Sequence, residues 1–121
     1  MSLVNGKLNL TNECILLKNE CSFQTEFGEV WLRFAQTPVV EVELYIDFKL
    51  PEAVQIENSF IMGKEMYMGR TAVLFEEDNP SGDAVTFLGS CNLPEMEWVL
   101  TLNYKAGDQK GSLSVYFSTS Q

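Results

Sequence analysis

The chain contains no histidine among its 121 residues. This absence excludes Ser-His-Asp and Cys-His nucleophile systems within the polypeptide, together with every metal site or acid–base step that uses an imidazole. Glycine-rich phosphate loops and dinucleotide-binding fingerprints are missing as well. We therefore expect a protein that is not an enzyme, with no catalytic residues, no cofactor and no metal site.

Long apolar runs and clustered basic residues are also missing. No run approaches the ~18 residues that a membrane-spanning helix needs, and the eight Lys and Arg residues are scattered singly between Lys7 and Lys110. Because phosphate-rich surfaces attract concentrated basic patches, we expect neither nucleic acid nor a membrane as a partner. The first residues lack the basic region and apolar stretch of a secretory signal, which predicts a cytoplasmic location.

Cysteine is scarce, with three residues in the chain. Three cannot all pair within one chain, and they do not form the dense framework of a small secreted scaffold. The triplet Asn-Glu-Cys occurs at both 12–14 and 19–21, but a metal clip usually needs a closer cysteine pair and often histidine. We expect Cys14, Cys21 and Cys91 to be reduced thiols that serve as small apolar side chains.

Negative charge is what the chain has in excess, because 17 acidic and 8 basic residues give a net charge of −9 at pH 7. Such a charge keeps many small proteins soluble, and it also favours a basic partner. Carboxylates at Glu41 and Glu43, or around the turn at 76–83, have the plainer explanations of a polar strand face and a tight turn. The length and the 45% hydrophobic content predict one β domain over residues 1–121.

The clearest structural signal is the segment 39–50, in which apolar and polar residues alternate through about six pairs. This period of two predicts a strand with one dry face and one acidic face, since a helix would spread the apolar side chains around its axis. Further strands are predicted at 7–10, 14–17, 23–34, 56–62, 66–68, 71–76, 84–88, 98–104 and 113–118. The pattern predicts an all-β fold, a single antiparallel β-sandwich, with a small closed β-barrel as the alternative.

Turn chemistry predicts two hairpins. The segment Asn79-Pro80-Ser81-Gly82 favours a turn that joins 71–77 to 83–89. A loop at 106–111 joins the last two strands, and their inward residues should meet across that hairpin to form one wall of the core: Trp98, Leu100, Leu102 and Tyr104 on one strand, with Leu113, Val115 and Phe117 on the other.

The polar face of the 39–50 strand is the predicted functional surface. Placing Phe34 opposite Val40 puts Arg33 opposite Glu41 on that face. Large aromatic residues beside carboxylates anchor protein partners, although a solvated acidic ladder with a covered tryptophan is the plainer interpretation. The predicted partner-binding residues are Trp31, Glu41, Glu43, Tyr45 and Asp47.

The leading functional hypothesis is a non-enzymatic acidic binding module that engages a protein with a basic surface, such as an inhibitor or immunity-type protein. One alternative is a carbohydrate-binding β-sandwich that stacks sugar rings on Trp31, Trp98 or tyrosines. Another is a structural or assembly subunit of a phage or secretion system, in which edge strands pair between copies. The sequence does not predict an oligomeric state.

Overall fold

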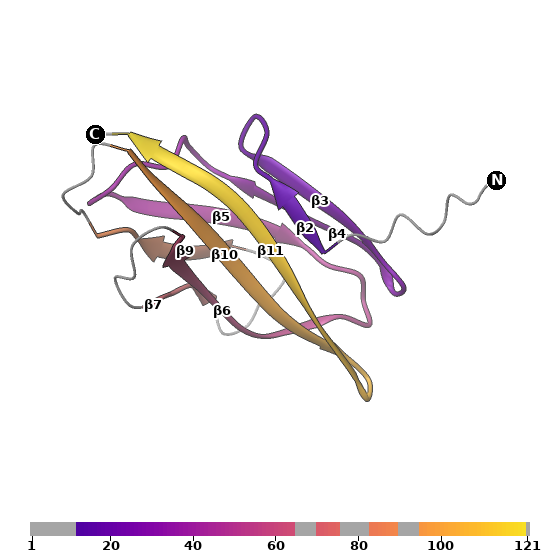
Figure 1. The fold of residues 1–121 in the computed structure, drawn as a ribbon. Helices are drawn as coiled ribbons and strands as arrows, with labels where there is room; N and C mark the ends of the chain where they lie inside the picture. The colour runs from indigo at the N-terminus through magenta and orange to yellow at the C-terminus, as the bar shows by residue number, and fades with distance from the viewer. Residues whose placement is uncertain (1–11, 65–69, 76–82, 90–94, 121) are drawn as a thin grey trace.

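The computed structural model describes residues 12–64, 70–75, 83–89 and 95–120. Two five-stranded sheets pack against each other in these residues (Figure 1), which confirms the predicted β-sandwich and leaves no closed barrel. The strand order is β2-β11-β10-β6-β7 in one sheet, here called sheet I, and β3-β4-β5-β9-β8 in the other, sheet II. The predicted strands at 7–10 and 66–68, the turn at 79–82 and Cys91 lie outside the described residues.

All paired strands are antiparallel except β2, which runs parallel to β11. Sheet I consists of β2 (Glu13–Ile15), β6 (Gln55–Gly63), β7 (Arg70–Ala72), β10 (Glu95–Ala106) and β11 (Gln109–Ser120). Sheet II consists of β3 (Glu20–Thr25), β4 (Gly28–Phe34), β5 (Glu43–Lys49), β8 (Leu74–Phe75) and β9 (Asp83–Phe87). The two sheets alternate along the chain, so neither is built from one continuous stretch of sequence.

The long hairpin of β10 and β11, orange and yellow in Figure 1, forms the centre of sheet I. Its register brings together the two sets of residues predicted to meet across the hairpin, with Trp98 opposite Phe117 and Leu100 opposite Val115. The connecting turn is shorter than predicted because Gly107 has a φ of 63°, a conformation that glycine adopts without strain and that suits a tight hairpin. Both strands are therefore twelve residues long.

One hydrophobic core lies between the sheets. Its side chains come from alternate positions of strands in both sheets, and each fully buried one stabilises the fold by about 1.5–3 kcal/mol. Phe34 of β4 meets Phe117 of β11 edge to face, with ring centroids 5.1 Å apart. The fully buried large side chains are Phe23, Phe34, Phe48, Leu32, Leu44, Ile46, Ile61, Leu88, Met96, Leu100, Leu102 and Val30.

The predicted strand 23–34 is wrong as one element, because the chain reverses between Thr25 and Gly28 to form the β3–β4 hairpin. The Thr25 hydroxyl accepts a hydrogen bond from the Phe27 N–H at 3.0 Å and donates one to the Gly28 carbonyl at 2.7 Å. Gly28 has a φ of 127°, and a Cβ there would lie 2.9 Å from Pro51 Cγ. Only glycine fits this position without strain.

The predicted pairing of Phe34 with Val40 is also wrong. Phe34 pairs with Ile46, and Arg33 faces Asp47 rather than Glu41. The strand starts only at Glu43, because Glu41 lies in a turn with a φ of 63° and donates its backbone N–H to the Leu88 carbonyl at 2.7 Å. The partner shifts by six positions, from Val40 to Ile46, and this even shift keeps residues 43–49 on their predicted faces. Val42, predicted on the dry face, lies before the strand and is 49% exposed.

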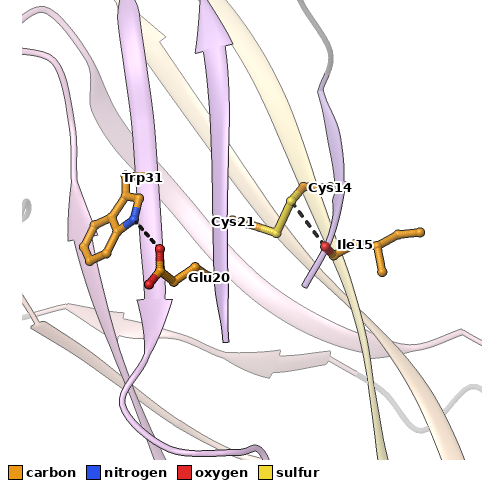
Figure 2. The surroundings of a disulfide bond; sticks show 5 residues. All are labelled: Cys14, Ile15, Glu20, Cys21 and Trp31. Carbon is orange, nitrogen blue, oxygen red and sulfur yellow. Dashed lines mark hydrogen bonds between the residues drawn. A yellow bond between two sulfur atoms is a disulfide. The ribbon is translucent and has the colours of Figure 1, made fainter. Parts of the chain in front are cut away.

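The expectation of reduced thiols is wrong for Cys14 and Cys21, which form a disulfide (Figure 2). Lys18 and Asn19 have φ values of 53° and 66°, so the chain turns back on itself and brings β2 beside β3. The two Cα atoms then lie 6.1 Å apart, within the range a disulfide spans. Because β2 belongs to sheet I and β3 to sheet II, the bond joins the two sheets along one edge of the sandwich.

Candidate functional site

Four of the five predicted partner-binding residues share the outer face of sheet II. Glu43, Tyr45 and Asp47 point outward from β5 because the residues between them are buried, and Trp31 points outward from β4. Glu41 lies in the turn before β5 and is not part of the strand. The structure thus brings together Trp31, Glu43, Tyr45 and Asp47, and places Glu41 at the end of the sheet beside Leu88.

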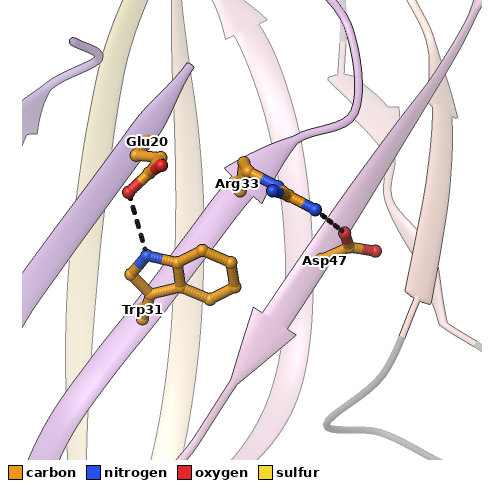
Figure 3. A network of polar contacts seen from close by, with 4 residues as sticks. All are labelled: Glu20, Trp31, Arg33 and Asp47. Atoms are coloured by element: carbon orange, nitrogen blue, oxygen red, sulfur yellow. Dashed lines mark hydrogen bonds and ion pairs between the residues drawn. The ribbon is translucent and has the colours of Figure 1, made fainter. Parts of the chain in front are cut away.

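Trp31 is held within a polar cluster that spans three strands (Figure 3). Its indole N–H donates to Oε1 of Glu20 at 3.3 Å, while Nη2 of Arg33 donates to Oδ2 of Asp47 at 3.3 Å. The Arg33 guanidinium carbon and Nζ of Lys49 lie 5.8 Å and 5.0 Å from the centre of the Trp31 ring, within cation–π range. This part of the face is therefore mixed in charge rather than purely acidic, with Trp31 and Asp47 half-buried and Glu20, Arg33 and Lys49 exposed.

An apolar patch lies beside this cluster and consists of Tyr45, Leu74, Val85 and Phe87. Tyr45 faces Val85 across β5 and β9, and Val85 faces Leu74 across β9 and β8. Phe87 follows two positions after Val85 and is paired with Glu43. The exposed fractions are 46% for Tyr45, 63% for Leu74 and 47% for Phe87. Exposed apolar side chains that lie together in this way make a candidate interaction surface.

Leu74 and Phe87 were not predicted as site residues. The segment 84–88 is apolar or small on both faces, so its sequence does not reveal which side is buried. The structure buries Ala84, Thr86 and Leu88, which turns Phe87 outward. The exposed position of Phe87 was predictable only from the pairing of β9 with β5.

A hydrogen bond links the patch to its nearest carboxylate. The Tyr45 hydroxyl donates to Oε1 of Glu43 at 2.9 Å. This hydrogen bond and the negative charge of Glu43 raise the pKa of Tyr45, because an ionised phenol would lie beside a carboxylate. Tyr45 is therefore a neutral donor across the physiological range, and Glu43 carries the negative charge at the edge of the patch.

The described residues contain no group of three or more Cys, Asp or Glu side chains that could hold a metal ion. The acidic segment 76–82, predicted as part of a turn, lies outside those residues. A groove of about 950 Å³ opens beside the disulfide, with Ile15, Leu16, Pro38 and Trp98 among its lining. In the part of the chain that the structure describes, no helix is long and apolar enough to cross a bilayer.

No protein-family model, curated protein or solved structure matches this chain. Its candidate function therefore rests on the geometry and charge of its own residues.

Proposed function

We propose that this protein is a non-enzymatic binding module whose outer sheet II face docks a protein with a basic surface. The observation that carries the proposal is the apolar patch of Tyr45, Leu74, Val85 and Phe87, with Glu43 at its edge. Exposed aromatic side chains on a rigid sheet supply contact area at a low entropic cost. The adjacent carboxylate and the net charge of −9 favour a basic partner.

The contact has two parts with different roles. The apolar patch is the centre, where burial of Tyr45 and Phe87 gives most of the affinity. The Trp31 cluster is the rim, because its charges already interact with one another and leave little net energy for a partner. Glu43 supplies the acidic contact at the edge of the patch, because its carboxylate accepts the Tyr45 hydrogen bond and its strand position pairs with Phe87.

The two alternative functions receive less support. Trp98 is 3% exposed and donates its indole N–H to Thr119 at 2.9 Å, and two cations contact the Trp31 ring, so neither tryptophan offers a free platform for a sugar. For an assembly subunit, the edge strands are β2 and β7 in sheet I and β3 and β8 in sheet II. β2, β7 and β8 have three residues or fewer, and the six-residue β3 lies beside β2, to which the disulfide joins it. Short or covered edges are poor templates for pairing with another strand.

Variants of single residues in a pull-down test this proposal. We would immobilise the wild-type protein and the variants Glu43→Lys, Phe87→Ser and Glu52→Lys, and pass a lysate of the source cells over each. Glu52 is an exposed carboxylate in the turn before β6, so its variant makes the same charge change away from the patch. We expect wild type and Glu52→Lys to retain a basic protein that rising salt releases, and the other two variants to lose it.

The outcomes separate clearly. A partner lost with Glu43→Lys and Phe87→Ser alone supports the proposal. A partner retained equally by all four proteins would place binding elsewhere on the molecule. Capture of no protein by wild type would contradict the binding function.

The cytoplasmic location stays a prediction, and the disulfide favours a different one. A bond between Cys14 and Cys21 persists most readily in an oxidising compartment. We therefore propose that the protein functions outside the reducing cytosol. Rapid acid quenching of source cells followed by thiol alkylation tests this proposal. If the disulfide is present in the cell, Cys14 and Cys21 should resist alkylation until a reductant is added. Immediate alkylation of both cysteines would support a cytosolic location instead.

A further inference from the structure

Strand β2 covers only part of the edge of sheet I. It pairs with Ser114–Tyr116 in the middle of the twelve-residue β11, and β11 continues past the end of β2 (Figure 1). The Leu16 N–H donates to the Tyr116 carbonyl at 2.9 Å, and the chain then turns away into β3 of sheet II, where the disulfide holds it. The C-terminal end of β11 is therefore an edge that no strand covers in the described residues.

The backbone groups of Ser118 point toward this open edge. The Ser114 N–H and the Tyr116 carbonyl both form hydrogen bonds on the β2 side, and Ser118 faces the same way because backbone groups alternate along a strand. Glu97, which lies opposite Ser118 on β10, has its carbonyl bonded to the Lys64 N–H at 2.8 Å and so faces away from β11. In the described part of the chain, the N–H and carbonyl of Ser118 thus have no backbone partner.

The groove of about 950 Å³ opens at this edge, since its lining includes Tyr116, Phe117 and Ser118 of β11. Its apolar lining includes the buried side chains of Phe117, Trp98 and Pro38. An extended segment placed beside Ser118 can form backbone hydrogen bonds with β11 while every second side chain contacts these apolar residues.

The outer rim of the groove has a negative charge without a cationic partner. Nζ of Lys64 lies 3.4 Å from Oε1 of Glu97, so these two charges offset each other. Glu13, the other charged lining residue, accepts a hydrogen bond from the Tyr116 hydroxyl at 3.2 Å and forms no ion pair within the described ranges. The rim therefore favours a basic side chain.

We propose that this groove binds an extended peptide segment of a partner protein, which adds to sheet I as a strand beside β11, beyond the end of β2. Hydrogen bonds to the Ser118 backbone set its register, apolar side chains at alternate positions contact Phe117 and Pro38, and a Lys or Arg between them reaches Glu13. The free edge is too short to hold a strand by backbone pairing alone, so the apolar contacts supply much of the affinity. The groove shares no residue with the apolar patch on sheet II, and the inference does not rest on that patch.

Hydrogen exchange of the free protein tests whether the edge is open. The Ser118 amide should exchange rapidly, whereas the amides of Phe117 and Thr119, which point toward β10, should be protected. Slow exchange at Ser118 without added peptide would mean that the chain itself or a second copy already covers the edge, and would overturn the proposal.

A phage-displayed library of random peptides, selected on the wild-type protein, supplies the probe for binding. Ser118→Pro removes the free N–H, and an edge position accepts proline, whereas the matched control Ser118→Ala removes only the hydroxyl. The dissociation constant of a selected, synthesised peptide should rise by about tenfold in Ser118→Pro and stay within about threefold of wild type in Ser118→Ala. Phe87→Ser, on the patch of sheet II, should bind the peptide as wild type does.

Methylation of the peptide backbone gives a second test that leaves the protein unchanged. N-methyl groups placed at each residue in turn should weaken binding at alternate positions of the docked segment, because every second N–H of an added strand faces β11. Glu13→Gln should weaken binding by about threefold, and the control Glu52→Gln should not.

Four outcomes would overturn the proposal. They are a selection that enriches no peptide, equal binding by Ser118→Pro and wild type, loss of binding in Phe87→Ser, and N-methyl effects that do not alternate.

Discussion

Reduction of the Cys14–Cys21 bond should lower the stability of the fold by an amount that the loop length sets. The bond closes a short loop, with a sequence separation of seven. The chain-entropy relation then gives a loss of about 8 cal/mol/K in the unfolded state, or roughly 2.4 kcal/mol at 25 °C. For a chain of this length, that corresponds to a fall in Tm of about 10 °C.

The assay is urea unfolding of the same protein with and without a phosphine reductant, because reduction adds two hydrogens and removes no side chain. Thiol titration in denaturant supplies the control: the native chain should show one reactive thiol before reduction and three after it, because the chain has three cysteines and one bond. If the oxidised and reduced proteins have unfolding free energies that agree within about 0.5 kcal/mol, the entropic reasoning is refuted. Three thiols before reduction would refute the bond itself.

Three further predictions concern single residues. Leu44→Ala should cost about 2–5 kcal/mol in urea unfolding, because Leu44 is 1% exposed, and a loss under about 1 kcal/mol would contradict its inward position. Gly28→Ala should lower the free energy of unfolding by at least about 1 kcal/mol, because Gly28 has a positive φ and an added Cβ would press on Pro51. The control Gly89→Ala should lower it much less, because nothing lies within 4 Å of a Cβ at that position. Equal effects of the two variants would contradict the strain argument. Glu43→Gln should lower the pKa of Tyr45 toward its usual value, measured by phenolate absorbance against Tyr45→Phe. Because folding raises the pKa of Tyr45, its hydrogen bond to Glu43 is fully present below the usual tyrosine pKa and is lost as the pH rises through the pKa of Tyr45 in the folded protein. If Tyr45 titrates in Glu43→Gln as it does in wild type, Glu43 is not the cause of the raised pKa.

The inward and outward assignment of side chains was predictable from the sequence on β5 but not on β9, and the pairing of strands was only partly predictable. In β5, alternation alone fixes which residues are buried, because Leu44 and Ile46 must share one face. The partner of Phe34 was not predictable, since every even shift satisfies the same alternation. The deciding feature was the turn at Glu41, whose left-handed conformation few non-glycine residues adopt and which no local pattern signals.

The disulfide was missed for a similar reason. Spacing alone does not bring Cys14 and Cys21 together, because a strand continuing through 18–20 would carry them far apart. The reversal at Lys18 and Asn19 is what places them side by side, and only asparagine is a residue that often takes such a conformation. The β10–β11 hairpin, in contrast, was predicted as a hairpin because a glycine-containing segment lies between two alternating strands, although its turn is shorter than predicted.

The contrast between the two outer faces arises from how the chain divides its strands. β3, β4 and β5 enter sheet II, β6 and β7 enter sheet I, β8 and β9 return to sheet II, and β10 and β11 complete sheet I. Charged outward positions on β5 and the uncharged outward residues in the middle of β10, Val99, Thr101 and Asn103, thus come to lie on opposite sides of one core, although the sequence shows only a single acidic average.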